Sequence, residues 1–238
     1  MLKNKFNMTQ EQNVFLAKRN IVDTIWKSAL LEGIPITFPE TQTIYDGGNI
    51  AHLGIDQLQI INNLKHAWKF CIMTINDNIN LNYISSIHSL IGTNLVESPG
   101  MMRIYDVNMG GTKWKPELPS KERMEQLLKE YSNNEIITDG AITLMCKLMK
   151  LQYFNDGNKR TAMCLFNSML MSKEIVPPPI NLINDDQMVK AYYNAHEKDY
   201  EMLQSVVAEK YRETKNIPDN NNNKQEEMES NYKKEFEK

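Results

Sequence analysis

Apolar side chains recur at helical spacing along most of the chain. From residue 9 to residue 32 they return every three or four positions, which predicts one amphipathic helix. Gly33 follows directly and can adopt the left-handed conformation that ends a helix. The same spacing predicts further helices over residues 56–76, over residues 80–92, and after Ser120, a residue that suits the N-cap position.

Two segments are apolar around most of the helix circumference. They cover residues 141–151 and 161–171. A helix without a polar face must be buried on most sides, so we expect both at the centre of the domain. The glycines and prolines of residues 33–54 indicate a connection, and two amphipathic helices are predicted over residues 185–196 and 198–212.

The period changes near the middle of the chain. Within residues 102–109, Arg103, Tyr105 and Val107 share one face of an extended segment, and two consecutive glycines follow at 110 and 111. Alternation followed by a glycine turn predicts a small β-hairpin. The fold class expected from the whole pattern is therefore mainly α-helical, with one short hairpin.

The composition shifts after about residue 214, where four consecutive asparagines precede a mixed lysine and glutamate tail. Such a segment cannot bury enough apolar surface to fold by itself. We therefore divide the chain into an N-terminal helix and connector (1–54), a core (55–213) and a flexible tail (214–238).

Composition and charge exclude several classes of protein. Of the 238 residues, 41% are hydrophobic and 24% are charged, a balance typical of a globular domain. A net charge of -3 argues against a general nucleic-acid binder. No apolar run reaches the roughly 18 residues of a membrane-spanning helix, and we expect no signal peptide. Three cysteines without CxxC spacing suit buried free thiols in a reducing cytoplasm.

A strongly polar loop, residues 152–160, separates the two most apolar helices. Gly157 lets the backbone approach a ligand, and the N–H groups that open the next helix attract anions. Lys159 and Arg160 oppose the helix dipole there, a disadvantage that a bound phosphate would reverse. Asp156 beside them suits Mg²⁺ held together with phosphate oxygens. These residues alone are compatible with a phosphate or nucleotide site, but they favour slightly an ordinary turn between helices.

The loop resembles the Fic/Doc (Fido) motif, His-x-Phe-x-Asp/Glu-Gly/Ala-Asn-Gly/Lys-Arg. The matching positions are Phe154, Asp156, Gly157, Asn158, Lys159 and Arg160. Residues 100–111 also resemble the hairpin, or flap, that docks a target chain in this family. The resemblance covers roughly residues 10 to 205 and implies an all-α Fido-like bundle with a short β-hairpin flap.

The family transfers AMP or phosphate from a nucleotide triphosphate to a protein hydroxyl. The resemblance therefore implies ATP and Mg²⁺ as ligands and a protein bearing a Ser, Thr or Tyr hydroxyl as partner. It also implies a role for each matching residue: Phe154 anchors the loop, Asp156 binds Mg²⁺, Gly157 and Asn158 help form the anion hole, Lys159 belongs to the phosphate site, and Arg160 contacts a distal phosphate. On the flap, Arg103, Tyr105 and Val107 would dock the target.

Two departures from the motif bear on activity. Gln152 stands where the family has its catalytic histidine, and an amide is no general base, a loss of roughly 10²–10⁴-fold in rate. Yet phosphoryl transfer depends mostly on positioning, and a Gln orients the nucleophile in Ras-like GTPases. Met163 replaces a second arginine of the AMP-transferring members, and Lys159 also matches the Doc-like branch. We therefore keep two hypotheses, a slow transferase and a catalytically silent nucleotide-binding or protein-interaction pseudoenzyme.

The first predicted helix ends in a second family pattern, Ser/Thr-x-x-x-Glu-Gly/Asn, at Ser28, Glu32 and Gly33. In members with an N-terminal brake, this Glu blocks the distal phosphate. Residues four apart share a helix face, so Ser28 and Glu32 would both point at the site. With no arginine at Met163, Glu32 would have to pair with Lys159 or Arg160. The alternative is a surface Glu before a glycine cap.

The four histidines show no metal-ligand spacing. His88, within an apolar stretch, is expected to pack against the core, and His66 is also expected to be structural. A DNA-binding regulator is a weak third hypothesis, because the sequence has no helix-turn-helix signal and no basic stripe.

Overall fold

The computed structural model describes residues 9–108, 115–132 and 137–172. These ranges contain eight helices and no strand, which confirms the predicted all-α fold class. The helices are α1 (Gln10–Arg19), α2 (Ile21–Leu31), α3 (Phe38–Tyr45), α4 (Ile55–Met73), α5 (Leu81–Gly92), α6 (Lys121–Ser132), α7 (Ile137–Leu151) and α8 (Asn158–Ser172).

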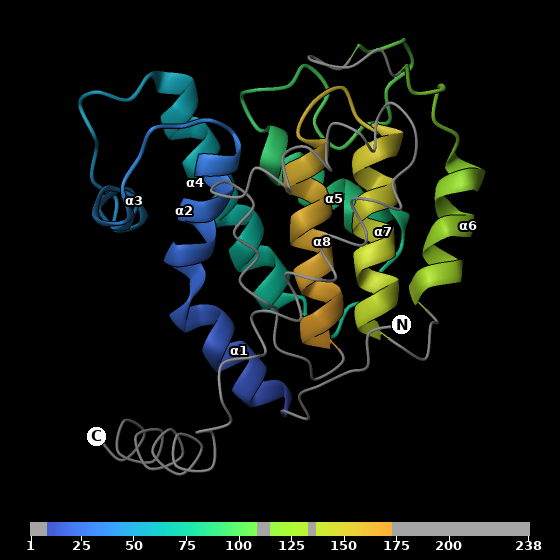
Figure 1. The fold of residues 1–238 in the computed structure, drawn as a ribbon, viewed down its shortest axis with the longest axis horizontal. Helices are drawn as coiled ribbons and strands as arrows, with labels where there is room; N and C mark the ends of the chain where they lie inside the picture. The colour runs from blue at the N-terminus through green and yellow to red at the C-terminus, as the bar shows by residue number, and fades with distance from the viewer. Residues whose placement is uncertain (1–8, 109–114, 133–136, 173–238) are drawn as a thin grey trace.

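Helix α8 lies at the centre of the bundle (Figure 1). It packs against α7, α5, α4 and α1, while α6 covers the other side of α7 and α2 packs on α4. Every residue from Arg160 to Met171 is buried. This burial was expected, because the segment is apolar around nearly its whole circumference. The apolar stretch within α7 is buried for the same reason. The polar loop joins these two central helices at one end of the bundle.

The predicted helix over residues 9–32 is two helices, α1 and α2, separated at Asn20. The Asn20 N–H still donates to the carbonyl of Leu16, and its own carbonyl accepts from Thr24. The apolar period continues across the break, which is why the pattern alone predicted one element. Asn is a weak helix former, and its backbone φ of -97° and ψ of 5° lie outside the helical region here.

The predicted connection over residues 33–54 contains the short helix α3. A capping box begins it, in which Thr37 Oγ1 accepts from the Glu40 N–H and the Glu40 carboxylate accepts from the Thr37 N–H. Pro39 lies in the first turn, where its missing N–H costs nothing. The sequence carried this start signal, and the prediction overlooked it because glycine and proline dominate the segment.

The end of α2 is set by Gly33, as predicted. Gly33 has φ +74°, its N–H donates to Leu30 O at 2.8 Å, and the Ile34 N–H donates to Ala29 O at 3.1 Å. This pair of bonds is a Schellman motif, which satisfies the last carbonyls of the helix. It places Glu32 at the C-cap, on the side of α2 that faces the loop.

The hairpin prediction is not confirmed. Residues 102–108 form no strand, and Arg103 is 1% exposed whereas Tyr105 is 48% exposed, so the two do not share a face. The Arg103 N–H donates to the carbonyl of Tyr153, a residue of the loop, instead of to a partner strand. The predicted glycine turn lies outside the described residues, as do the helices predicted over 185–196 and 198–212 and the tail from 214.

All three cysteines are buried and free, as predicted. Among the described residues, no helix combines the length and the apolar character needed to cross a bilayer. The division of the chain at residues 54 and 213 stays a prediction.

Candidate functional site

Phe154 anchors the loop between α7 and α8 in the core. Its ring is 2% exposed and stacks on His88, with 3.7 Å between ring centroids and 2° between ring planes. The Asn158 side chain closes the loop from the other side, because its Oδ1 accepts from the Phe154 N–H and its Nδ2 donates to the Phe154 carbonyl, both at 2.8 Å. These two bonds tie the loop to the first residue of α8.

His88, on α5, packs against the loop and forms a hydrogen bond with it. The Gly100 N–H donates to Nδ1 at 2.8 Å, so the ring proton must lie on Nε2, which donates to the Asp156 carbonyl at 2.8 Å. Burial of the ring lowers the pKa of His88 to about 4, and the nearby Arg160 charge acts in the same direction. His88 is thus neutral near pH 7 with both nitrogens engaged. It is packed as predicted, whereas His66 is exposed.

Gly157 is packed closely against α5. Its φ is +74°, and a Cβ at this position would lie 2.9 Å from Cγ2 of Ile91. A side chain is therefore excluded both by backbone conformation and by space. The Gly157 N–H points at the loop's own carboxylate and donates to Asp156 Oδ1 at 2.6 Å.

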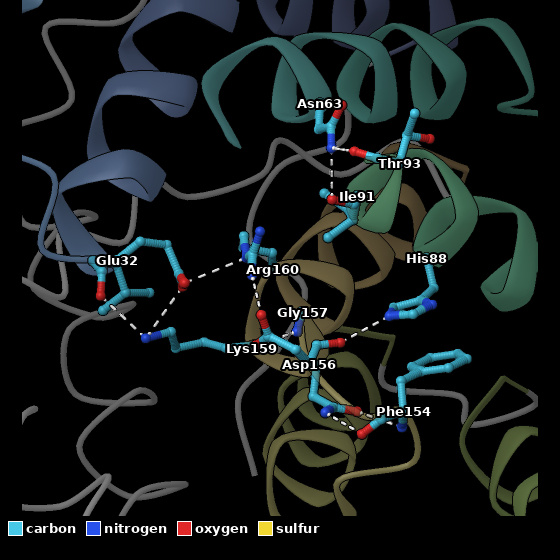
Figure 2. A network of polar contacts seen from close by, with 12 residues as sticks. Glu32, Asn63, His88, Ile91, Thr93, Phe154, Asp156, Gly157, Lys159 and Arg160 are labelled. Atoms are coloured by element: carbon cyan, nitrogen blue, oxygen red, sulfur yellow. Dashed lines mark hydrogen bonds and ion pairs between the residues drawn. The ribbon is translucent and has the colours of Figure 1, made fainter. Parts of the chain in front are cut away.

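The two cations of the loop share one carboxylate from α2. Glu32 Oε1 lies 3.2 Å from Nζ of Lys159, and Glu32 Oε2 lies 3.3 Å from Nε of Arg160 (Figure 2). Lys159 also donates to the carbonyl of Leu31, and Arg160 Nη2 lies 3.2 Å from Asp156 Oδ2. Arg160 is 4% exposed and Glu32 is largely buried. The pairing of Glu32 expected from the sequence is present, with both cations.

Ser28 behaves differently from Glu32, although both were expected to point at the site. Ser28 is buried, and its hydroxyl donates to the Thr24 carbonyl at 2.8 Å, one turn back in the same helix. Within the described residues, Glu32 therefore contacts the loop, whereas the Ser28 hydroxyl bonds within its own helix.

Gln152, which the sequence resemblance aligns with the motif histidine, lies directly after α7. Its backbone has φ +47°, a conformation uncommon for any residue other than glycine. Its side-chain Nε2 donates to the Met149 carbonyl at 2.6 Å, and its Oε1 accepts from Asn158 Nδ2 at 3.1 Å. The two ends of the amide are therefore bonded to the last turn of α7 and to the first residue of α8.

Of the three residues assigned to target docking, the structure leaves two accessible. Tyr105 is exposed and Val107 is half-buried, but Arg103 is among the most deeply buried side chains of the described residues. Its guanidinium points inward to backbone carbonyls, including that of Gln152. Sequence spacing gave no sign of this inward position, because nothing in the alternating pattern separates Arg103 from Tyr105.

The residues of the loop fit a magnesium ion that is shared with a phosphate. The Asp156 side chain is 69% exposed and lies beside the guanidinium of Arg160. Within the described ranges no group of three or more His, Cys, Asp or Glu side chains gathers around one point. One carboxylate completed by phosphate oxygens and water is the coordination that Mg²⁺ commonly adopts at nucleotide sites, whereas a cage of protein ligands is not available here.

Comparison with known proteins supports the resemblance drawn from the loop. Residues 78–170 match the model of the Fic/DOC family. A fragment of Fic-1 from C. elegans superposes with a TM-score of 0.66 at 19% identity, covering 84% of this chain and 62% of that one. A Fic family protein from Desulfovibrio desulfuricans G20 superposes with a TM-score of 0.64 at 20% identity, covering 85% of this chain and 67% of that one.

These identities are low, so the solved structures establish a shared fold, the all-α fold of Fic proteins. The chain spans 62% of the Fic-1 fragment. By sequence, no protein of curated function matches it.

Proposed function

We propose that the protein binds ATP with Mg²⁺ at the loop between α7 and α8 and transfers AMP or phosphate to a protein Ser, Thr or Tyr hydroxyl. The observation that carries the proposal is the pairing of Lys159 and Arg160 with one carboxylate, Glu32, at the N-terminus of α8. Two cations at the N-terminus of a helix form an anion site, and Glu32 provides the anion in this structure. The cytoplasmic location expected from the free thiols is part of the same proposal.

Glu32 would act as a brake that a nucleotide must displace. The carboxylate is at the C-cap of α2, where the helix dipole disfavours negative charge by about 0.3–1 kcal/mol. Its two cationic contacts offset that cost. A phosphate group carries more charge than a carboxylate and would compete for the same cations, so loss of Glu32 should make the site easier to fill.

The loop residues would then act mainly by position and charge. Gly157 and Asn158 would shape the anion hole, Lys159 and Arg160 would neutralise phosphate oxygens, and Asp156 would hold the metal ion. When bound, Mg²⁺ would neutralise charge that develops on the phosphate oxygens. Asp156 would first have to leave the Gly157 N–H and Arg160, its partners in this structure.

Gln152 would orient the target hydroxyl without accepting its proton strongly. The reaction would therefore be slow compared with one that uses a histidine base. Lys159 in the motif and the apolar Met163 on α8, which is 7% exposed, favour phosphate transfer over AMP transfer.

A silent nucleotide-binding or protein-interaction module is the second candidate. The observation that favours it is the conformation of Gln152, whose amide is bonded at both ends to Met149 and Asn158. These two bonds hold the side chain along the loop and leave only one donor and one acceptor position of the amide for a hydroxyl.

Calorimetric titration with ATP and Mg²⁺ tests the binding step. The comparison variant is Asn158→Ala/Arg160→Ala, with circular dichroism to show that it is folded. We expect saturable binding by the wild type that the variant loses.

Incubation with ATP labelled at the α- or the γ-phosphate then separates the two candidates: labelled protein supports a transferase, and binding without any labelling supports the silent module. Absence of binding in both wild type and Glu32→Gly would refute both nucleotide hypotheses.

A further inference from the structure

We infer that Arg103 is a positioning residue that holds the backbone of Gln152 in place, and is not a docking residue of the flap. The importance of position 152 for chemistry rests on the proposed function. That Arg103 holds the backbone at residue 152 is argued from its hydrogen bonds alone.

The guanidinium of Arg103 makes hydrogen bonds to carbonyls of three separate segments. Nε donates to the Gln152 carbonyl at 2.5 Å and Nη1 donates to the Tyr105 carbonyl at 2.9 Å. Nη2 donates to the carbonyls of Pro116 and Glu117, at 3.3 and 2.5 Å. Four of the five N–H groups of the side chain are thereby used, in the forked geometry that only arginine offers.

The guanidinium of Arg103 is buried and hydrogen-bonded to neutral carbonyls, while the charge of Asp106 is near enough to favour its protonated form. None of the ion pairs found among the described residues includes it, and burial lowers the pKa of its guanidinium. A buried charge with no carboxylate in ion-pair contact is costly, and an apolar side chain of similar volume would avoid the cost. Packing alone therefore does not account for an arginine here, whereas the bonds to carbonyls do.

The bond to the loop falls on its least relaxed residue. Gln152 has φ +47°. Arg103 holds two consecutive peptide groups of the loop: its Nε donates to the Gln152 carbonyl, and its backbone N–H donates to the Tyr153 carbonyl. Holding these peptide groups constrains the direction of the Cα–Cβ bond of Gln152, from which its side chain projects. Arg103 thus links the orientation of the motif residue to residues 103–105 and 116–117, the chain on either side of the predicted flap tip.

The competing explanation is that Arg103 only ties residues 103–105 to residues 116–117 and has no effect on the loop. The variant Arg103→Lys separates this explanation from a positioning role. Lysine keeps the charge but cannot reach four carbonyls. The matched control is Arg123→Lys, the same exchange at an exposed arginine that also contacts Glu117. Hydrogen–deuterium exchange is followed for the amides of residues 152–154 and for α4. We expect exchange at 152–154 to become about tenfold faster in Arg103→Lys, with α4 unchanged and no effect in the control.

Uniform acceleration across the protein, or no change at 152–154, would overturn the inference. A double-mutant cycle adds an independent measurement. Glycine adopts φ +47° without cost, so Arg103→Lys should lower the melting temperature less in a Gln152→Gly background than in the wild type. Equal losses in both backgrounds would show that Arg103 does not hold position 152.

The catalytic consequence is measured in a Gln152→His background. There Arg103→Lys should lower kcat by about tenfold or more while the Kd for ATP stays unchanged, because misplacing a reacting group affects turnover rather than nucleotide binding. Unchanged kcat in an active background contradicts a positioning role. If that background shows no activity, the proposed function fails, and the exchange and melting experiments still decide on Arg103.

Discussion

The carboxylate of Glu32 lies 3.3 Å from Nε of Arg160, so the end of α2 and the start of α8 are joined by a largely buried ion pair. The same carboxylate reaches Lys159 at 3.2 Å. The cations most suited to phosphate are therefore already neutralised within the protein. Any anion that enters the site must exchange with Glu32, and this contact is the natural place to test the proposed function.

Replacing Glu32 with glutamine should raise affinity and lower stability at the same time. We expect ATP with Mg²⁺ to bind about tenfold more tightly, which corresponds to about 1.4 kcal/mol. The free energy of unfolding should fall, because Arg160 loses a partner while it remains buried. Calorimetry and urea unfolding measure the two effects.

The matched control for this exchange is Glu117→Gln, since Glu117 forms an exposed pair with Arg123 and should have little influence on either quantity. Unchanged ATP affinity in Glu32→Gln would remove the brake from the proposal.

Restoring the motif histidine should increase transfer. Gln152→His supplies a general base, for which we expect a rise of roughly 10²–10⁴-fold in the rate of labelling. The assay is transfer from labelled ATP to proteins of a cell lysate, resolved on a gel. Gln126→His, on the exposed face of α6, is the control. A lysate left unlabelled by both wild type and Gln152→His would contradict the transferase hypothesis.

Substituting Gly157 should destabilise the protein beyond the cost of its backbone conformation. Gly157→Ala places a methyl group 2.9 Å from Ile91 Cγ2 at a residue with φ +74°, and we expect a loss of about 1–3 kcal/mol. Gly47→Ala is the comparison, because Gly47 has φ +96° with no atom within 4 Å of an added Cβ. Chemical denaturation should show the larger loss for Gly157→Ala, and equal losses would mean that the loop can move away from α5.

Acid should weaken the fold through His88. The pKa of this histidine is lowered from its usual 6.5 to about 4 in the folded protein, chiefly by burial. The neutral ring therefore contributes stability that is fully present above pH 6.5 and is lost as the pH falls towards 4. The loss is about 3 kcal/mol at 1.36 kcal/mol per pKa unit.

Urea unfolding of the wild type and of His88→Gln, each at pH 7 and pH 4.5, measures this contribution. Glutamine does not titrate, so the variant should lose less stability between the two pH values than the wild type does. The same pH dependence in both proteins would assign the acid sensitivity to other groups.

Sequence periodicity predicted the central helices well, because α7 and α8 are apolar on nearly every side and admit no other position. It was less accurate where a local signal competed with composition. The capping box of α3 was hidden among glycines and prolines, and the break at Asn20 left the apolar period intact. In residues 102–108 the alternating pattern was misleading, since Arg103 turns inward for reasons that lie in another part of the chain.

The sequence by itself determined the helical class, the polar loop with its two adjacent cations, and the glycine end of α2. These are consequences of short-range preferences, which act within a few residues. The tertiary structure decided which groups meet: Glu32 with Arg160, His88 with Phe154, and Arg103 with the Gln152 carbonyl. Such contacts join segments far apart in the chain, and the direction of a side chain in irregular backbone depends on the carbonyls and charges that packing brings within its reach.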